Sequence, residues 1–242
     1  MEKATWLDGV TWLLSPPEQS LALVLADNGF DVWVVNARGT KYSLGHKSLS
    51  SNDPAFWDWS WDELAAYDLP ATFQYIYDQT SQKLHYVGHS MKHINCVDLL
   101  TSYTGQNCCL NSSMISSFLK HEPQSTSTKN MIHFAQMIRQ GTIAMYDYGS
   151  EDDNNKHYGQ TTPPDYNMTS IPNDLPLFLG YGGEDLLSDV KDVQTLINAL
   201  SDHEPDKLVL QYIQDYAHLD FVYAINAKQV VYDPLVAFFR LN

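Results

Sequence analysis

Basic residues are scarce in this sequence, and the shortage argues against two kinds of partner. The 242 residues include 14 Lys and Arg against 29 Asp and Glu, which gives a formal net charge of −15. A nucleic-acid phosphate backbone is bound by clustered basic side chains, and anionic membranes attract basic segments in the same way. We therefore expect no nucleic-acid partner and no electrostatic attraction to an anionic membrane.

Long apolar runs are also absent from the sequence. No run approaches the roughly 20 apolar residues that a membrane-spanning helix needs. Residues 1–15 contain no basic segment followed by an apolar core, so no signal peptide is predicted there. A turn sequence, Asp8-Gly9, follows almost at once and suggests that the chain is shortened at its start.

Cysteine is the third scarce feature. The three cysteines are Cys96, Cys108 and Cys109, and an odd number leaves at least one unpaired unless it bonds between chains. Their spacing is not that of a metal site. Which cysteines pair stays open at this point.

The first hundred residues alternate between helical and strand patterns. Residues 16–27 predict a helix, 30–36 predict a buried strand, and 57–78 predict a long helix kinked near Pro70. A short strand is predicted at 84–87, and residues 91–103 can form a helix. The pattern returns with strands at 175–181 and 207–213, a helix at 190–200, and a closing helix at 220–239 interrupted at Pro234. This alternation predicts an α/β fold with a mostly parallel sheet and helices on both faces.

The middle of the chain interrupts this regular order. Residues 104–173 contain no convincing buried strand; short helices are predicted near 115–119 and 130–139, and polar loops include 151–155. We interpret this region as a cap or lid. The predicted organisation is an N-terminal part of the core at 1–103, the lid at 104–173, and a C-terminal part of the core at 174–242.

Gly88-His89-Ser90 follows the predicted strand at 84–87. A serine on a tight strand-to-helix turn is exposed above the sheet, as in the nucleophile elbow Gly-x-Ser-x-Gly, although Lys92 stands where the second glycine belongs. The alternative is an ordinary strand end followed by a helix whose N-cap is Ser90.

Asp185 and His218 each follow the end of a predicted strand, where catalytic groups gather in open parallel sheets. The order Ser90, Asp185, His218 is that of the α/β-hydrolase triad. A histidine must remove the serine proton, and a carboxylate must fix the histidine tautomer. Taken singly, Asp185 could cap the following helix and His218 could be a surface histidine.

The stretches that carry a family resemblance are residues 8–12, 29–33, 36–40, 56–63, 86–90, 130–133, 146–149, 181–189 and 216–221. With them, nearly the whole chain resembles the acid lipase family, which includes gastric and lysosomal acid lipases, and in particular its plant members. The resemblance implies an α/β-hydrolase fold with a lid, a triad of Ser90, Asp185 and His218, and hydrolysis of triacylglycerols or sterol esters without metal or cofactor.

The chain also departs from the family pattern. Residues 3–7 replace the His-Gly segment that supplies one oxyanion amide in the family, whereas the second amide, that of Met91, is present. Several tens of residues, including a core strand and much of the lid, are missing after the elbow. The alternative hypothesis is therefore a catalytically silent remnant or splice form of a lipase.

The resemblance also implies where such a protein works and what it meets. It implies a secreted, lysosomal or vacuolar location, a lipid ester substrate and transient contact with lipid surfaces. Two N-glycosylation sequons, Asn111-Ser112-Ser113 and Asn167-Met168-Thr169, matter only if the chain enters the secretory pathway.

Overall fold

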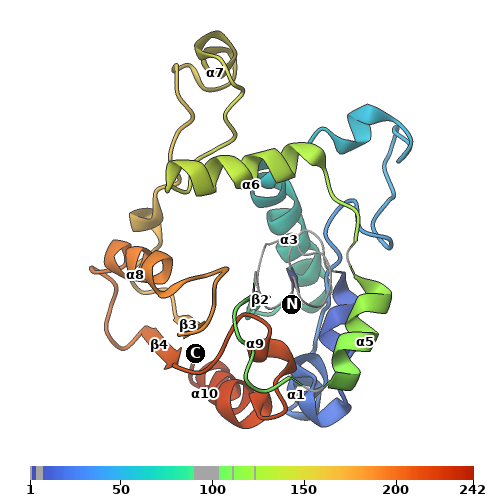
Figure 1. Cartoon of the computed structure of the whole chain (residues 1–242), viewed down its shortest axis with the longest axis vertical. Helices are drawn as coiled ribbons and strands as arrows, with labels where there is room; N and C mark the ends of the chain where they lie inside the picture. The colour runs from blue at the N-terminus through green and yellow to red at the C-terminus, as the bar shows by residue number, and fades with distance from the viewer. Residues whose placement is uncertain (1, 4–7, 90–103, 111, 123) are drawn as a thin grey trace. The chain divides into compact units, whose positions relative to one another are not determined.

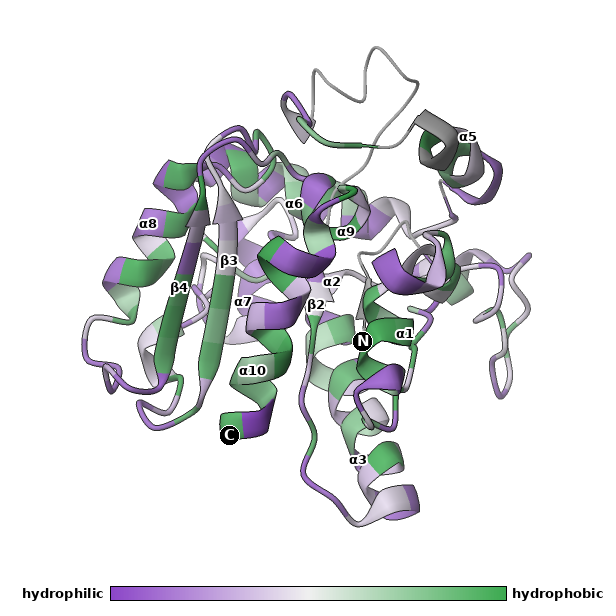
Figure 2. Ribbon diagram, turned by 90° about the horizontal axis from the view of Figure 1, so that it is seen from below, coloured by the Kyte–Doolittle hydropathy of each residue, from purple (hydrophilic) through white to green (hydrophobic). Residues whose placement is uncertain are grey.

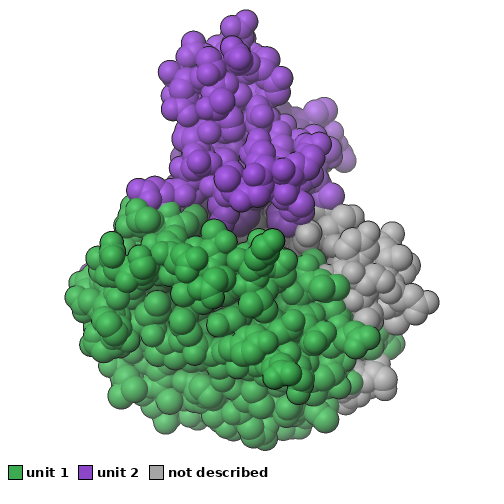
Figure 3. Space-filling model, turned by 60° about the vertical axis from the view of Figure 1, so that its left-hand side comes forward, with its two compact units in different colours: residues 1–35, 85–123, 168–242 green, residues 36–84, 124–167 purple. Residues whose placement is uncertain are grey.

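The computed structural model describes residues 2–3, 8–89, 104–110, 112–122 and 124–242 (Figure 1). Its contacts divide the chain into two compact units, which Figure 3 colours separately. Unit 1 comprises Met1–Val35, His85–Pro123 and Met168–Asn242. Unit 2 comprises Asn36–Leu84 and Gln124–Asn167.

The strands of unit 1 form two parallel pairs. β1 (Glu2–Lys3) pairs with β2 (Gly88–His89), and β3 (Leu177–Gly182) pairs with β4 (Leu208–Ile213). The register of the second pair runs from Leu177 opposite Leu208 to Gly182 opposite Ile213. The strands predicted at 175–181 and 207–213 are thus confirmed, and the described strands pair in parallel as expected.

Two other strand predictions are confirmed only in part or not at all. Residues 30–36 contain a single β-bridge residue, Val35, and no strand, whereas 84–87 lie outside any strand because β2 begins only at Gly88. The apolar pattern that suggested strands reflects packing instead: Phe30, Val32, Val34 and Val87 contact the hydrophobic core. A strand needs a hydrogen-bonding neighbour, and no ladder among the described residues reaches either segment.

Helices supply most of the remaining structure of unit 1. Figure 2 shows β3 and β4 side by side with α8 and α10 next to them, and the rings of Phe178 and Phe238 meet at 5.6 Å between β3 and α10. The helical segments are η1 (Gly9–Leu13), η2 (Pro17–Gln19), α1 (Leu21–Asp27), α5 (Ser112–His121), η5 (Met168–Ser170), α8 (Val190–Ala199), α9 (Asp220–Tyr223), η6 (Lys228–Tyr232) and α10 (Asp233–Leu241).

Most of these helices match the sequence predictions, and the closing helix is interrupted at two places. α9 ends at Tyr223, and Ala224 is extended, so one break lies ten residues before Pro234. The π-helical turn η6 ends two residues before Pro234, so the predicted interruption near Pro234 is also present. The helix predicted at 91–103 lies outside the described residues.

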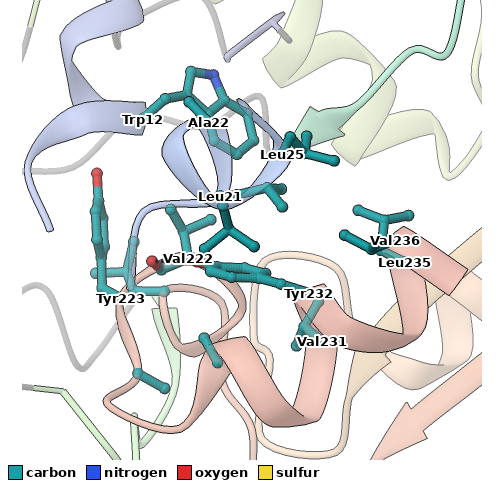
Figure 4. Packing of buried hydrophobic residues seen from close by; sticks show 14 of the residues in the cluster. Trp12, Leu21, Ala22, Leu25, Val222, Tyr223, Val231, Tyr232, Leu235 and Val236 are labelled. Carbon is teal, nitrogen blue, oxygen red and sulfur yellow. Dashed lines mark hydrogen bonds between the residues drawn. The ribbon is translucent and has the colours of Figure 1, made fainter. Parts of the chain in front are cut away.

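The core of unit 1 joins the beginning of the chain to its end. Leu21 of α1 lies over the ring of Tyr232 of the C-terminal segment (Figure 4), and Leu25 and Val231 belong to the same buried cluster. Tyr232 is fully buried and its hydroxyl donates a hydrogen bond to the carbonyl of Val222 at 2.8 Å. Burial of an aromatic side chain is a large apolar contribution, and the hydrogen bond removes the cost of burying its hydroxyl.

Unit 2 is helical. Its elements are η3 (Pro54–Trp57), α2 (Trp61–Glu63), η4 (Leu64–Asp68), α3 (Leu69–Thr80), α6 (Thr128–Gln140) and α7 (Glu151–Tyr158). The long helix predicted at 57–78 appears as α2, η4 and α3. η4 is a π-helical turn directly before Pro70, which lacks the N–H that a regular helix would use there. The predicted irregularity at Pro70 is therefore confirmed.

α7 corrects the prediction of a loop at 151–155. Its residues are polar and mostly exposed, as expected, yet they form a helix with good ends. Ser150 accepts a hydrogen bond from the N–H of Asp153, and Gly159 ends the helix in the left-handed conformation. Within the described part of the chain, no helix is long and apolar enough to cross a membrane.

Candidate active site

Two glycines, the last residue of β3 and the residue after it, bring the end of this strand close to the segment that follows β4. A Cβ atom on Gly182 would lie 2.0 Å from the carbonyl oxygen of Tyr216, and one on Gly183 would lie 2.4 Å from that of Gln214. Neither approach is possible for a residue with a side chain. The N–H of Glu184 then donates to the carbonyl of Tyr216 at 3.1 Å, which fixes the two segments together.

Asp185 and His218 meet as a result of this approach. Nδ1 of His218 lies 2.9 Å from Oδ2 of Asp185, and the two side chains are only 8% and 5% exposed. The other carboxylate oxygen, Oδ1, accepts the N–H groups of Leu187 and Ser188 at 2.8 and 2.9 Å. The carboxylate is therefore held at both oxygens, one by its own turn and one by the imidazole.

This hydrogen bond determines which nitrogen of His218 carries the proton. Because a carboxylate only accepts, Nδ1 donates to Asp185, and in the neutral ring Nε2 is left with its lone pair. Nε2 is buried and has no hydrogen-bond partner among the described residues. The arrangement is that of a base oriented by a carboxylate.

His89 is the last described residue before Ser90, and it lies directly against His218. Its Nε2–H donates to the backbone carbonyl of His218 at 2.9 Å, and the two ring centroids are 4.8 Å apart. Ser90, the predicted nucleophile, lies outside the described residues, as do Met91 and Lys92. The structure thus brings together Asp185 and His218 and places the start of the predicted elbow beside them.

Residues 104–107, which the sequence analysis placed at the start of the lid, contact the backbone at His218 and at Glu184, the residue before Asp185. The carbonyl of Thr104 accepts the N–H of His218 at 3.0 Å, and Oδ1 of Asn107 accepts the N–H of Leu219 at 3.0 Å. Gly105 has a φ of +89°, and a Cβ there would lie 1.6 Å from the carbonyl oxygen of Glu184. The glycine was the only sequence signal of this close contact.

Asp220 is the second residue that the sequence analysis missed. It is fully buried, and its carboxylate accepts three backbone N–H groups: those of Ala217 at 2.9 Å, Cys108 at 3.0 Å and Cys109 at 3.1 Å. Burial raises the pKa of Asp220 above its usual value, although these three hydrogen bonds act in the opposite direction. From the sequence, Asp220 was expected only to begin the closing helix.

Cys108 and Cys109 are joined by a disulfide bond, which answers part of the question of cysteine pairing. Their sulfur atoms and a carboxylate oxygen of Asp220 lie within 4.8 Å of one another, close enough for a metal site. A metal would need the cysteines as thiolates, however, and disulfide sulfurs do not supply that ligand. The third cysteine, Cys96, lies outside the described residues.

Comparison with known proteins identifies the family. No family model matches the chain. It is 41% identical to triacylglycerol lipase 2 of Arabidopsis thaliana, over 97% of this chain and 74% of the relative. Identity to triacylglycerol lipase 1 of the same plant is 36%, over 99% of this chain and 79% of the relative. The chain belongs to the acid lipase family.

Human gastric triacylglycerol lipase is a more distant relative, 30% identical over 93% of this chain and 75% of the relative. Membership makes the chain a carboxylic ester hydrolase and implies an α/β-hydrolase fold. The alignment with lipase 2 runs over 309 positions, although this chain has only 242 residues. The relative therefore has residues within the aligned region that this chain lacks.

Proposed function

We propose that the protein is a triacylglycerol lipase that cleaves ester bonds through a triad of Ser90, Asp185 and His218. The observation that carries the proposal is the buried Asp185–His218 pair, whose Nε2 is left without a partner among the described residues. The position of His89 against His218, one residue before Ser90 in the chain, supports Ser90 as the nucleophile. The family supports the reaction, because the relatives are named as triacylglycerol lipases.

In the proposed mechanism, Nε2 of His218 takes the proton of the Ser90 hydroxyl as its oxygen attacks the ester carbonyl. Asp185 keeps the imidazole in the required tautomer and stabilises its charged form. The backbone N–H of Met91 stabilises the oxyanion that develops. His218 then gives its proton to the departing alcohol, and a water molecule, activated by the same Nε2, releases the fatty acid.

The finer features of the fold and the substrate remain part of the proposal. We take residues 104–173 as the lid of an α/β-hydrolase whose core has helices on both faces of a parallel sheet. The substrates are triacylglycerols, with sterol esters as a second group of apolar esters. We expect the protein to act in a secreted, lysosomal or vacuolar setting, at the surface of lipid particles.

Ester turnover by purified protein tests the proposal. The Ser90→Ala variant is compared with the unchanged chain on a short-chain p-nitrophenyl ester, a triacylglycerol emulsion and a sterol ester. We expect turnover of the first two by the unchanged chain and loss of turnover in the variant at equal folded content, followed by circular dichroism. Equal turnover by both proteins, or no turnover by a folded unchanged chain, would overturn the proposal, and the second result would favour a silent remnant.

A further inference from the structure

We propose that Cys108 and Cys109 form a redox-sensitive site whose disulfide state controls the positioning of His218, with Asp220 as the connecting residue. The consequence for ester hydrolysis rests on the proposed function, whereas the redox site itself does not. All the residues that carry the inference belong to unit 1.

The disulfide between Cys108 and Cys109 restricts the local backbone and contributes little to global stability. It joins adjacent residues, so it closes the shortest possible loop of the chain. A disulfide restricts the unfolded chain more as the closed loop grows longer, so this one contributes little to the stability of the whole protein. What it does restrict is the relative direction of two consecutive peptide groups.

The carboxylate of Asp220 accepts a hydrogen bond from the N–H of each cysteine, so it depends on the orientation of both peptide groups. Its Oδ2 accepts the N–H of Cys108 and its Oδ1 accepts that of Cys109, at 3.0 and 3.1 Å. Oδ2 also accepts the N–H of Ala217 at 2.9 Å, the residue directly before His218. One fully buried carboxylate therefore connects Cys108 and Cys109 to the loop that carries His218.

Two further contacts join the segment of Cys108 and Cys109 to the residues that follow α9. The carbonyl of Cys109 accepts the N–H of Ile225 at 3.0 Å, and Leu110 forms an antiparallel bridge with Ala224. The short helix α9, which follows His218, is thus bound at its start by Asp220 and beyond its end by this bridge. A change in the backbone at the cysteines reaches both ends of α9.

The two sulfur-bearing residues differ in access to solvent. Cys108 is exposed, whereas Cys109 is half-buried and packs against the hydrophobic core. A small dithiol reductant can therefore reach the sulfur of Cys108. A thiolate of the reductant attacks this sulfur and forms a mixed disulfide with Cys108. The S–S bond to Cys109 breaks, and Cys109 leaves as a thiolate that takes up a proton. The second thiol of the reductant then displaces Cys108, so the reductant becomes a disulfide and the protein gains two thiols.

Reduction frees the two peptide groups to turn independently, so Asp220 no longer holds both N–H groups together with that of Ala217. We expect kcat to fall on reduction, by as much as ~10²-fold, the loss that a displacement of ~1 Å can cause at a catalytic group. KM should change little, because no described contact places the cysteines among substrate-binding groups. Reoxidation should restore kcat.

The experiment uses the Cys96→Ser variant of the full chain, so that only one cysteine pair is present. The protein is assayed on a p-nitrophenyl ester before and after dithiothreitol, and again after reoxidation. Peptide mass spectrometry with an alkylating reagent reports the state of Cys108 and Cys109. Amide hydrogen exchange of the peptides covering 104–110 and 214–220 provides a readout that needs no catalysis.

The expected result is an oxidised pair, a reversible loss of kcat on reduction, and faster exchange in both peptides. A Cys108→Ser/Cys109→Ser variant should show the reduced level of activity and no response to dithiothreitol. Free thiols in the untreated protein, or unchanged kcat and exchange after confirmed reduction, would overturn the inference. If the oxidised protein lacks ester turnover, the proposed function fails, and hydrogen exchange still decides whether the redox site acts on the loop of His218.

Discussion

Glycines set the geometry around Asp185 as much as the charged groups do. Gly182 and Gly183 allow the end of β3 to pass against the segment after β4, and Gly105 fits against the carbonyl of Glu184. Each of these contacts is between backbone atoms, so a single added Cβ would have to push the two segments apart. The position of the carboxylate is thus sensitive to changes that remove no functional group.

Replacing Gly105 with alanine tests this sensitivity. We expect Gly105→Ala to lower kcat and stability together, because the new Cβ overlaps the carbonyl of Glu184 directly before Asp185. The matched control is Gly141→Ala, which also has a positive φ but has no atom within 4 Å of the added Cβ. The control should cost only the backbone strain, about 1–2 kcal/mol. Ester kinetics and urea unfolding of both variants measure the difference, and equal losses would contradict the steric explanation.

Asp185→Asn separates the electrostatic role of the carboxylate from its structural one. The amide oxygen can still accept the N–H groups of Leu187 and Ser188, so the turn after β3 should persist. The amide nitrogen, however, donates toward Nδ1 of His218 and forces the proton onto Nε2. We expect kcat to fall about 10⁴-fold, the loss caused by the wrong tautomer in triad enzymes, with the melting temperature nearly unchanged. A loss below tenfold would show that Asp185 does not orient His218.

At the scale of elements, Asn154 holds the segment around α7 together. It is 3% exposed; its Oδ1 accepts the N–H of Tyr148 at 2.9 Å, and its Nδ2 donates to Oδ1 of Asp147 at 2.9 Å. This donation, and to a lesser extent that from the N–H of Gly149, lowers the pKa of Asp147. One buried amide thus ties this polar helix to residues 147 and 148, beside the stacked rings of Tyr148 and His157.

Asn154→Ala should release this segment. It leaves the N–H of Tyr148 without its partner, and an unsatisfied buried group costs about 1–3 kcal/mol. Asn155→Ala is the matched control, since the side chain of Asn155 is exposed and only its backbone carbonyl, which the substitution keeps, accepts a hydrogen bond, from Gly159. Hydrogen exchange across residues 146–160 should accelerate in the first variant and stay unchanged in the second. Equal exchange rates in the two variants would show that the side chain of Asn154 does not hold this segment in place.

The helices and strands that could be predicted are those whose apolar spacing and end residues lie within a short stretch of sequence. β3, β4 and α8 have apolar spacing and end signals within a few residues, and Asp189 caps α8 by accepting the N–H groups of Lys191 and Asp192. The segment 30–36 has the same apolar character, but becoming a strand depends on a neighbour elsewhere in the chain. α7 was missed for the opposite reason, because its stability comes from capping and not from an apolar face.

The same distinction holds for the candidate site. Asp185 and His218 could be predicted, because each follows a strand end and catalysis needs those residue types in that order. The contacts of Thr104 and Asp220 could not, because they join backbone groups more than a hundred residues apart. Their residue types are also compatible with many other roles, so sequence alone gives no reason to select them.

For the whole molecule, the net charge of −15 should govern how it meets a lipid surface. Like charges repel across the Debye length, which shrinks from ~30 Å at 0.01 M salt to ~8 Å at 0.15 M. On a triacylglycerol emulsion containing anionic lipid, we therefore expect turnover to rise with added NaCl. An emulsion of neutral lipid is the control and should show little salt dependence. A fall in turnover with salt on the anionic emulsion would indicate a local basic contact surface instead.

The core of unit 1 has a consequence for the synthesis of the protein. Trp12 and α1 pack against Tyr223, Tyr232 and α10, and the hydroxyl of Tyr223 donates to the carbonyl of Thr11 across 212 residues of sequence. On the ribosome, the first helix is made long before its partners exist, so its apolar face stays uncovered in the nascent chain. A premature stop codon before residue 216 would remove every C-terminal partner at once. Such a product would leave the ribosome with a hydrophobic surface that only a chaperone or a protease would recognise.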